Sequence, residues 1–211
     1  MKKRIAVLVS GGGTNLQALI DAQQRGELGG GEIAAVISTK DGAYALERAA
    51  KAGIAGFVLP RKDFESVPAM TSALVKMLRE LNIDLVVLAG CMTIFTEELI
   101  EAYRNAIMNV HPALIPSFCG KGYYGLRVHE EALKYGVKVS GATVHFVTEE
   151  CDGGPIIAQE PVAILPDDTP ETLQRRIMEQ GEWIALPRAV ALFCQDRITV
   201  EGRIVKIKEN V

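Results

Sequence analysis

Residues 5–24 read Ile-Ala-Val-Leu-Val-Ser-Gly-Gly-Gly-Thr-Asn-Leu-Gln-Ala-Leu-Ile-Asp-Ala-Gln-Gln, and this segment is the most informative about the class of fold. It opens with a continuous apolar run at 5–9, which is typical of a parallel strand that is covered on both faces. Three glycines follow, and the segment 16–24 then carries apolar side chains at 16, 19 and 20, which is helical spacing. A strand, a glycine turn and a helix in this order predict the first unit of an α/β sheet.

Strands and helices continue to alternate after this unit. Further strands are predicted at 32–38, 54–59, 84–89, 106–110, 140–147 and 156–162, and further helices at 43–52, 69–81, 97–103, 128–135 and 169–186. Short links between alternating strands and helices predict a Rossmann-like, doubly wound, mostly parallel sheet with helices on both faces. A hairpin over 197–207 follows, and no repeat or linker is visible, so we expect residues 1–211 to form a single domain.

The composition is typical of a soluble globular protein. Hydrophobic residues make up 48% of the 211 residues, charged residues make up 23%, and the net charge is −3. This charge argues against nucleic-acid and membrane-surface partners. The apolar run at 5–9 is shorter than the roughly 7–15 residues of a signal-peptide core, and no run approaches the roughly 18–20 residues of a membrane span. We therefore expect a cytoplasmic protein.

Cysteines and histidines are few and scattered: Cys91, Cys119, Cys151, Cys194, His111, His129 and His145. No Cys-x-x-Cys spacing occurs, so a zinc site is poorly supported and we expect no metal. Four separated cysteines in a cytoplasmic protein are expected to be reduced thiols. We interpret His129 and His145 as packed, hydrogen-bonded residues rather than ligands.

The turn Ser10-Gly-Gly-Gly-Thr-Asn15 between the first strand and the first helix is a candidate anion site. Glycines allow unusual backbone angles and close ligand approach, and N–H groups at a helix start point at an anion. Thr14 and Asn15 add side-chain donors. The spacing matches neither the Walker pattern nor Gly-x-Gly-x-x-Gly. We interpret the turn as a phosphate site, with a tight turn that binds no ligand as the alternative.

The stretch Met108-Asn-Val-His-Pro112 reads as the end of a buried strand that stops at a proline. Side chains two apart in a strand share one face, so Asn109 and His111 project together where the strand ends. An amide donor beside an imidazole can hold an oxyanion and move a proton. The alternative is an ordinary strand end with two satisfied polar residues.

Two more segments fall at strand ends, where ligands of such sheets bind. The apolar loop Gly90-Cys-Met-Thr-Ile-Phe95 suits a slot for a flat heterocycle, although a loop that only packs on the core would read the same. The turn Thr148–Pro155 holds Asp152, whose carboxylate could orient a histidine or accept a proton. Asp-Gly-Gly is also ordinary turn chemistry.

The segment 112–125, rich in glycine and aromatic residues, is expected to be a long irregular loop over the strand ends and a candidate mobile lid. It contains Cys119, the obvious candidate for a covalent nucleophile. No base lies beside this cysteine in the sequence, and we do not favour a covalent scheme.

The helix predicted at 169–186 has Thr169 as its expected cap, without a full capping box, and Ile184 among its candidate core contacts. Glu179 and Glu182 are three residues apart and should therefore lie on one side of the helix. Solvated surface is the default interpretation of this pair. A clamp for a cationic or hydroxylated ligand is the alternative.

Five motifs carry a resemblance to a known family: Ser10–Leu16, Asp84–Met92, Asn109–Pro112, Thr143–Val147 and Asp152–Pro155. They occur in the same order as in the phosphoribosylglycinamide formyltransferases, the folate-dependent enzymes of purine synthesis, and the chain resembles this family from about residue 4 to residue 190. Asn-x-His-Pro with a downstream Asp-Gly-Gly is specific to the wider formyltransferase superfamily. The glycine loop narrows the resemblance to the glycinamide ribonucleotide branch.

The resemblance implies a role for each matching residue. Asn109, His111 and Asp152 match the catalytic residues. The residues that match the ribonucleotide site are Gly12, Gly13, Thr14, Asn15 and Glu182. The residues that match the site of the co-substrate, 10-formyltetrahydrofolate, are Met92, Thr93, Ile94, Phe95, Asn109, Thr148, Glu149, Glu150, Cys151 and Asp152. Thr93 stands where a longer basic residue is common in the family, and Val67 lies near the position from which an arginine of the family reaches the folate.

The implied activity is transfer of the formyl group of 10-formyltetrahydrofolate to the amino group of glycinamide ribonucleotide, by direct attack through an oxyanion. Both partners would be small molecules, with no metal, and the protein would be a monomer or a homodimer. We expect the nearby Asp152 carboxylate to favour the charged form of His111 at neutral pH. The alternatives are a formyl-folate hydrolase, another formyltransferase, or a non-catalytic nucleotide-binding module.

Overall fold

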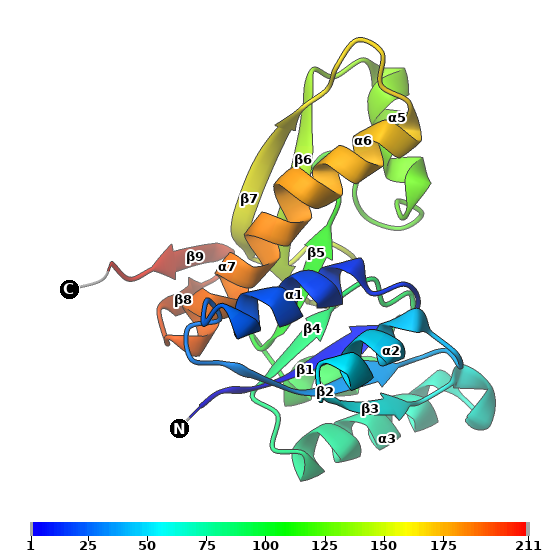
Figure 1. Ribbon diagram of the computed structural model, residues 1–211, viewed down its shortest axis with the longest axis vertical. Helices are drawn as coiled ribbons and strands as arrows, with labels where there is room; N and C mark the ends of the chain where they lie inside the picture. The colour runs from blue at the N-terminus through cyan, green and yellow to red at the C-terminus, as the bar shows by residue number, and fades with distance from the viewer. Residues whose placement is uncertain (1, 210–211) are drawn as a thin grey trace.

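Residues 2–209 are described by a computed structural model, and a seven-stranded sheet forms its centre (Figure 1). The strands are β1 (Arg4–Val9), β2 (Glu32–Ser38), β3 (Ala55–Val58), β4 (Leu85–Leu88), β5 (Ile107–His111), β6 (Val139–Phe146) and β7 (Ile156–Ala163). They lie in the order β3-β2-β1-β4-β5-β6-β7. A separate hairpin pairs β8 (Ile198–Glu201) with β9 (Ile204–Ile207).

Helices connect the strands and cover the sheet. The α-helices are α1 (Thr14–Gln24), α2 (Tyr44–Lys51), α3 (Val67–Glu80), α4 (Glu97–Ala102), α5 (Leu126–Tyr135), α6 (Pro170–Ile177) and α7 (Trp183–Cys194). A short 3₁₀ turn spans Arg61–Asp63, and a π-helical turn, Met178–Glu182, joins α6 to α7. Within residues 2–209, no helix combines the length and the apolar character that a membrane crossing requires.

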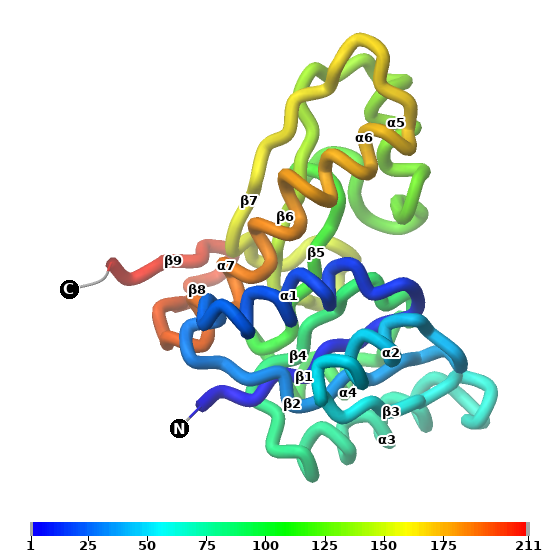
Figure 2. The backbone as a smooth tube through the Cα atoms, viewed as in Figure 1, coloured from blue at the N-terminus to red at the C-terminus, as the bar shows by residue number. Residues whose placement is uncertain are grey.

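Strand β5 is the place where the sheet changes direction. The ladders among β1, β2, β3, β4 and β5 are parallel. Beyond β5 they become antiparallel, first with β6 and then between β6 and β7. In Figure 2, β6, β7, α5 and α6 extend together away from the layers that β1 to β4 form with their helices. The predicted mostly parallel Rossmann-like sheet is confirmed.

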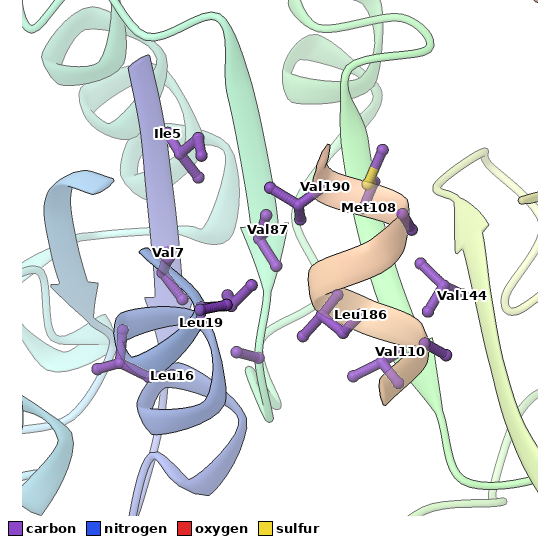
Figure 3. Close-up of a cluster of buried hydrophobic side chains, with 14 of the residues drawn as sticks. Ile5, Val7, Leu16, Leu19, Val87, Met108, Val110, Val144, Leu186 and Val190 are labelled. Carbon is purple, nitrogen blue, oxygen red and sulfur yellow. The ribbon is translucent and has the colours of Figure 1, made fainter. Parts of the chain in front are cut away.

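Two hydrophobic cores lie on the two faces of the sheet. Alternate strand residues feed them, so Val7 belongs to one core, and Ala6 and Leu8 belong to the other. The first core is covered by α1, α2, α6 and α7, and the second by α3 and α4. Figure 3 shows side chains of α1 and α7 over β1, β4 and β5. The predicted helices on both faces are therefore confirmed.

Helix α3 begins two residues earlier than the predicted start at 69. Ser66 caps it by accepting a hydrogen bond from the Ala69 N–H at 3.2 Å. Pro68 therefore lies in the first turn, where its missing N–H has no intrahelical partner to lose. The sequence-based boundary was wrong because the proline was assigned to the preceding loop.

The helix predicted at 169–186 is wrong in its extent, because α6, the π-helical turn and α7 together run from 170 to 194. Ile184 was expected in the core, but its side chain is 48% exposed. Thr169 caps α6 as predicted. It also forms a reciprocal capping box with Thr172, which was expected to be absent, because the Thr172 hydroxyl accepts from the Thr169 N–H at 2.9 Å.

Candidate active site

A row of polar side chains lies at the C-terminal end of β5 and continues onto its antiparallel neighbour β6. Asn109 and His111 share one face of β5, and in the antiparallel ladder their partners on β6 are His145 and Thr143. The Asn109 side-chain amide lies 3.3 Å from Nε2 of His145. The sequence-based prediction that Asn109 and His111 project together therefore holds, and the ladder adds a second histidine to them.

Asp152 reaches this row from the turn between β6 and β7. Its carboxylate lies 3.5 Å from Nδ1 of His111 and 3.6 Å from Nε2 of His145. The Gly120 N–H donates to the same carboxylate at 2.9 Å. Asp152 has a backbone φ of 54°, in the left-handed region that a tight turn requires and that Asp tolerates better than most residues. The turn thus brings the acid to both histidines.

Burial and neighbours shift the protonation of this cluster. Burial by itself would raise the pKa of Asp152, but the His145 hydrogen bond, the charge of His111 and the Gly120 N–H together hold that pKa below its usual range. Burial also lowers the pKa of His111, and the nearby Asp152 does not fully offset it. Burial therefore acts against the expected charged form of His111 in the free protein.

The surroundings of His111 nevertheless suit a proton acceptor. Its Nε2 lies 2.8 Å from the Phe118 carbonyl oxygen, and its Nδ1 faces the Asp152 carboxylate. Both neighbours are hydrogen-bond acceptors, so only the doubly protonated ring can donate to both. Burial favours the neutral ring, and its two neighbours stabilise the cation that forms when the ring takes a proton.

His145 was not predicted from the sequence to belong to this cluster. It was interpreted as a packed histidine, and it is indeed buried, with Nδ1 2.9 Å from the Phe146 carbonyl oxygen. Its Nε2, however, faces both Asn109 and Asp152. The signal that could have found it is the β5–β6 register, which a single sequence does not reveal.

The glycine turn before α1 has the geometry of an anion site. Gly13 is the N-cap of α1 with φ 72°, and a Cβ there would lie 2.7 Å from the Ala45 side chain. Because Gly13 has no side chain to cap α1, the first-turn N–H groups remain available to a ligand. The Arg48 guanidinium donates to the Gly12 carbonyl at 2.8 Å and adds positive charge beside the turn. Arg48 had not been singled out from the sequence.

Glu182 lies next to this turn. The Asn15 side-chain amide donates to its carboxylate at 2.5 Å, and burial raises the pKa of Glu182 although that hydrogen bond lowers it in part. Glu179 is exposed, so the prediction that Glu179 and Glu182 share one side is wrong. The reason is the π-helical turn over Met178–Glu182, which rotates residues by a different angle than an α-helix does.

A cavity of about 210 Å³ opens beside the catalytic cluster. Apolar side chains of β4, α4 and β5, including Leu88, Leu99 and Ile107, form its wall. Of the residues that the resemblance assigned to the folate, those that line it are Thr93, Ile94, Phe95, Asn109, Thr148, Glu149, Glu150, Cys151 and Asp152. Met92 is not among the residues that line the cavity; this residue is 55% exposed, and its N–H donates to the Ser10 hydroxyl at 3.0 Å.

The irregular loop 112–125 is attached to the same face of the sheet. The Thr143 hydroxyl accepts from the Ile115 N–H at 3.0 Å, and the Gln159 amide donates to the Ile115 carbonyl at 3.0 Å. These contacts fix the loop where it continues to Phe118 and Gly120. No group of three or more His, Cys, Asp or Glu residues suited to a metal ion occurs among the described residues.

The fold and the site define an α/β enzyme with a glycine turn, an amide–histidine–aspartate cluster and an adjoining cavity at one edge of the sheet. The formyl transferase family model matches residues 3–190, and the chain belongs to this family.

Named relatives agree with the resemblance drawn from the motifs. Phosphoribosylglycinamide formyltransferase of Haemophilus influenzae is 41% identical over 96% of this chain and 92% of that protein. The crystal structure of glycinamide ribonucleotide transformylase 1 from Symbiobacterium toebii has a TM-score of 0.92 and 43% identity, and the match covers 99% of this chain and 95% of that chain. A trifunctional purine biosynthetic protein of Drosophila melanogaster is 43% identical over 90% of this chain, which spans only 14% of that longer protein.

Proposed function

We propose that the protein transfers the formyl group of 10-formyltetrahydrofolate to the amino group of glycinamide ribonucleotide, a step of de novo purine biosynthesis in the cytoplasm. The observation that carries this proposal is the cluster of Asn109, His111 and Asp152 beside a cavity that the folate-matching residues line. The names of the relatives support the same substrates.

The ribonucleotide would bind on the side of the glycine turn. A phosphate at Gly12 and Gly13 would meet the free N–H groups of the first turn of α1, beside the Arg48 guanidinium that donates to the Gly12 carbonyl. Glu182, which accepts a hydrogen bond from the Asn15 side chain beside this turn, would receive the glycinamide group. The apolar wall and the polar rim of the cavity would receive the pterin ring of the folate, because flat heterocycles bind in such slots.

The mechanism needs one oxyanion donor and one proton path. When the substrate amine attacks the formyl carbon, negative charge develops on the formyl oxygen, and the Asn109 amide would donate to it. The proton that the amine loses would pass through the Asp152 carboxylate, which lines the cavity, to Nδ1 of the neutral His111, and Asp152 and the Phe118 carbonyl would stabilise the resulting cation. The proton would then return through Asp152 to the folate nitrogen as the carbon–nitrogen bond breaks. The nucleophile belongs to the substrate, so the protein forms no covalent intermediate in this scheme.

The test is a spectrophotometric assay of folate deformylation with and without glycinamide ribonucleotide. We expect turnover only with the ribonucleotide, and stoichiometric formation of formylglycinamide ribonucleotide. Turnover without the ribonucleotide would instead identify a formyl-folate hydrolase. An absence of turnover under both conditions would favour the nucleotide-binding module.

A further inference from the structure

Two cysteines lie on segments that meet at Asp152. Cys151 directly precedes Asp152, and Cys119 directly precedes Gly120, whose N–H donates to the Asp152 carboxylate at 2.9 Å. A Cβ built on Gly120 would lie 4.0 Å from the Cys151 carbonyl oxygen, so the two backbones run against each other at this point. Both thiols are free; Cys119 is half-buried and Cys151 is exposed.

We propose that Cys119 and Cys151 form a reversible disulfide under oxidising conditions, which ties the 112–125 loop to the turn that carries Asp152 and stops turnover. The residues on either side of Cys119 explain the consequence. Phe118 accepts the hydrogen bond of His111, and Gly120 donates to Asp152. A bond formed at Cys119 therefore acts directly on the contacts that hold both catalytic groups.

The chemistry requires a two-electron oxidant, for which we name a peroxide. The exposed Cys151, as thiolate, attacks one peroxide oxygen; the sulfur–oxygen bond forms, the oxygen–oxygen bond breaks, and water leaves after protonation. Cys119, as thiolate, then attacks the resulting sulfenic sulfur, so that the disulfide forms and a second water leaves. The pKa values of both thiols are raised, first by burial and next by the Asp152 charge, so the reaction accelerates as the pH rises.

The disulfide also removes an existing contact. The Cys119 thiol donates to the Pro116 carbonyl at 3.3 Å, and this hydrogen bond is lost in the disulfide because the sulfur no longer carries a proton. We expect the backbone of the loop to shift as a result. Because a displacement of about 1 Å in a catalytic arrangement can cost about 10²-fold in rate, we expect kcat to fall by about that factor. The loss of turnover rests on the proposed function, whereas formation of the cross-link does not.

The experiment treats the whole protein with hydrogen peroxide, blocks the remaining thiols by alkylation, and identifies peptides by mass spectrometry without reduction. We expect a Cys119–Cys151 peptide, a fall in kcat of about 10²-fold, recovery with dithiothreitol, and faster cross-linking at pH 8 than at pH 6. Cys119→Ser and Cys151→Ser should each abolish the cross-link and the reversible loss, relative to their own untreated activity. Cys194→Ser, which changes a half-buried thiol at the end of α7, should retain both.

Two results overturn the proposal: separate alkylation of Cys119 and Cys151 after peroxide treatment, or unchanged turnover by the cross-linked protein. The peptide measurement needs only wild-type protein, so a variant that fails to fold does not decide the outcome. If the reduced protein shows no formyl transfer, the proposed function fails while the peptide measurement still decides whether the cross-link forms.

Discussion

The turn that carries Asp152 and the π-helical turn that carries Glu182 each hold a carboxylate at the site, half-buried for Asp152 and buried for Glu182, and the pKa values of the two groups shift in opposite directions. Asp152 has two histidines and a backbone N–H around it, and its pKa is lowered. Glu182 has one amide donor, from Asn15, and burial raises its pKa. The same kind of group is therefore kept ionised in one place and pushed toward the neutral form in the other.

Burial and hydrogen-bond partners together decide what each carboxylate can do, because Glu182 is the more buried of the two and has fewer donors around it. Histidine partners can take up and release protons at physiological pH, so Asp152 can take part in proton transfer. An amide partner cannot, so Glu182 is suited to binding and orientation. In enzyme active sites, two carboxylates whose pKa values are shifted in opposite directions commonly have different roles.

Asp152→Asn should cause the greatest loss of activity among the substitutions considered for the two turns. The amide keeps the shape but removes the charge that stabilises the His111 cation, so kcat should fall by about 10²–10⁴-fold. Stopped-flow or steady-state assays with both substrates measure this, and circular dichroism checks the fold. Asp168→Asn, the same change at a half-buried aspartate outside the cluster, is the matched control and should keep kcat within about twofold. A D152N enzyme with more than a tenth of wild-type kcat would contradict the assigned role.

Asn109→Ala should lower kcat by about 10²–10³-fold, because one oxyanion donor typically contributes that much. The KM values should change little, since the donor acts mainly on the charge of the transition state. Thr143→Ala is the comparison. Thr143 lies on the neighbouring strand β6, and its removal deletes the hydrogen bond to the Ile115 N–H of the 112–125 loop while the Asn109 donor stays in place. A rise in KM with unchanged kcat for Asn109→Ala would show that Asn109 binds substrate and does not stabilise the oxyanion.

The region around Asp152 could be predicted from the sequence better than the π-helical turn that carries Glu182. Apolar runs and glycine turns are local signals, so the strand ends and the neighbouring Asn109 and His111 could be predicted. The role of His145 depends on the antiparallel register of β5 and β6, which is not a local property. Glu182 was matched by resemblance, but its separation from Glu179 follows from a π-helical turn, for which the spacing of residues gives no signal.

Asp168→Asn should change stability rather than activity. Arg176 holds Asp168 with hydrogen bonds of 2.5 and 2.6 Å, and the Arg176 hydrogen bonds hold the pKa of Asp168 far below its usual value. Hydrogen bonds to a charged group contribute about 1.5–3 kcal/mol, so the free energy of unfolding at pH 7 should fall by about that amount. Urea denaturation measures it.

The pH dependence of that loss has a definite sign. A carboxyl whose folded pKa is depressed contributes stability above its unfolded pKa, about 3.9, and that contribution disappears as the pH falls through the lower folded value. The gap between wild type and D168N should therefore be constant at neutral pH and shrink only at strongly acidic pH. A gap that shrinks between pH 7 and pH 5 would contradict the assignment.

Glu182→Gln carries the smallest expected effect and the opposite sign. A carboxyl whose folded pKa is raised weakens stability as the pH rises above its unfolded pKa of about 4.3, and the amide removes this penalty. The oxygen Oδ1 of Asn15 is buried with no hydrogen-bond partner among the described residues, and the new amide can donate to it. The free energy of unfolding at pH 7 should therefore rise by about 1 kcal/mol, while KM for the ribonucleotide rises. Glu179→Gln, three residues away and exposed, should change neither. A loss of stability in E182Q would mean that Glu182, like Asp152, is held as a carboxylate, and the contrast between the two turns would fail.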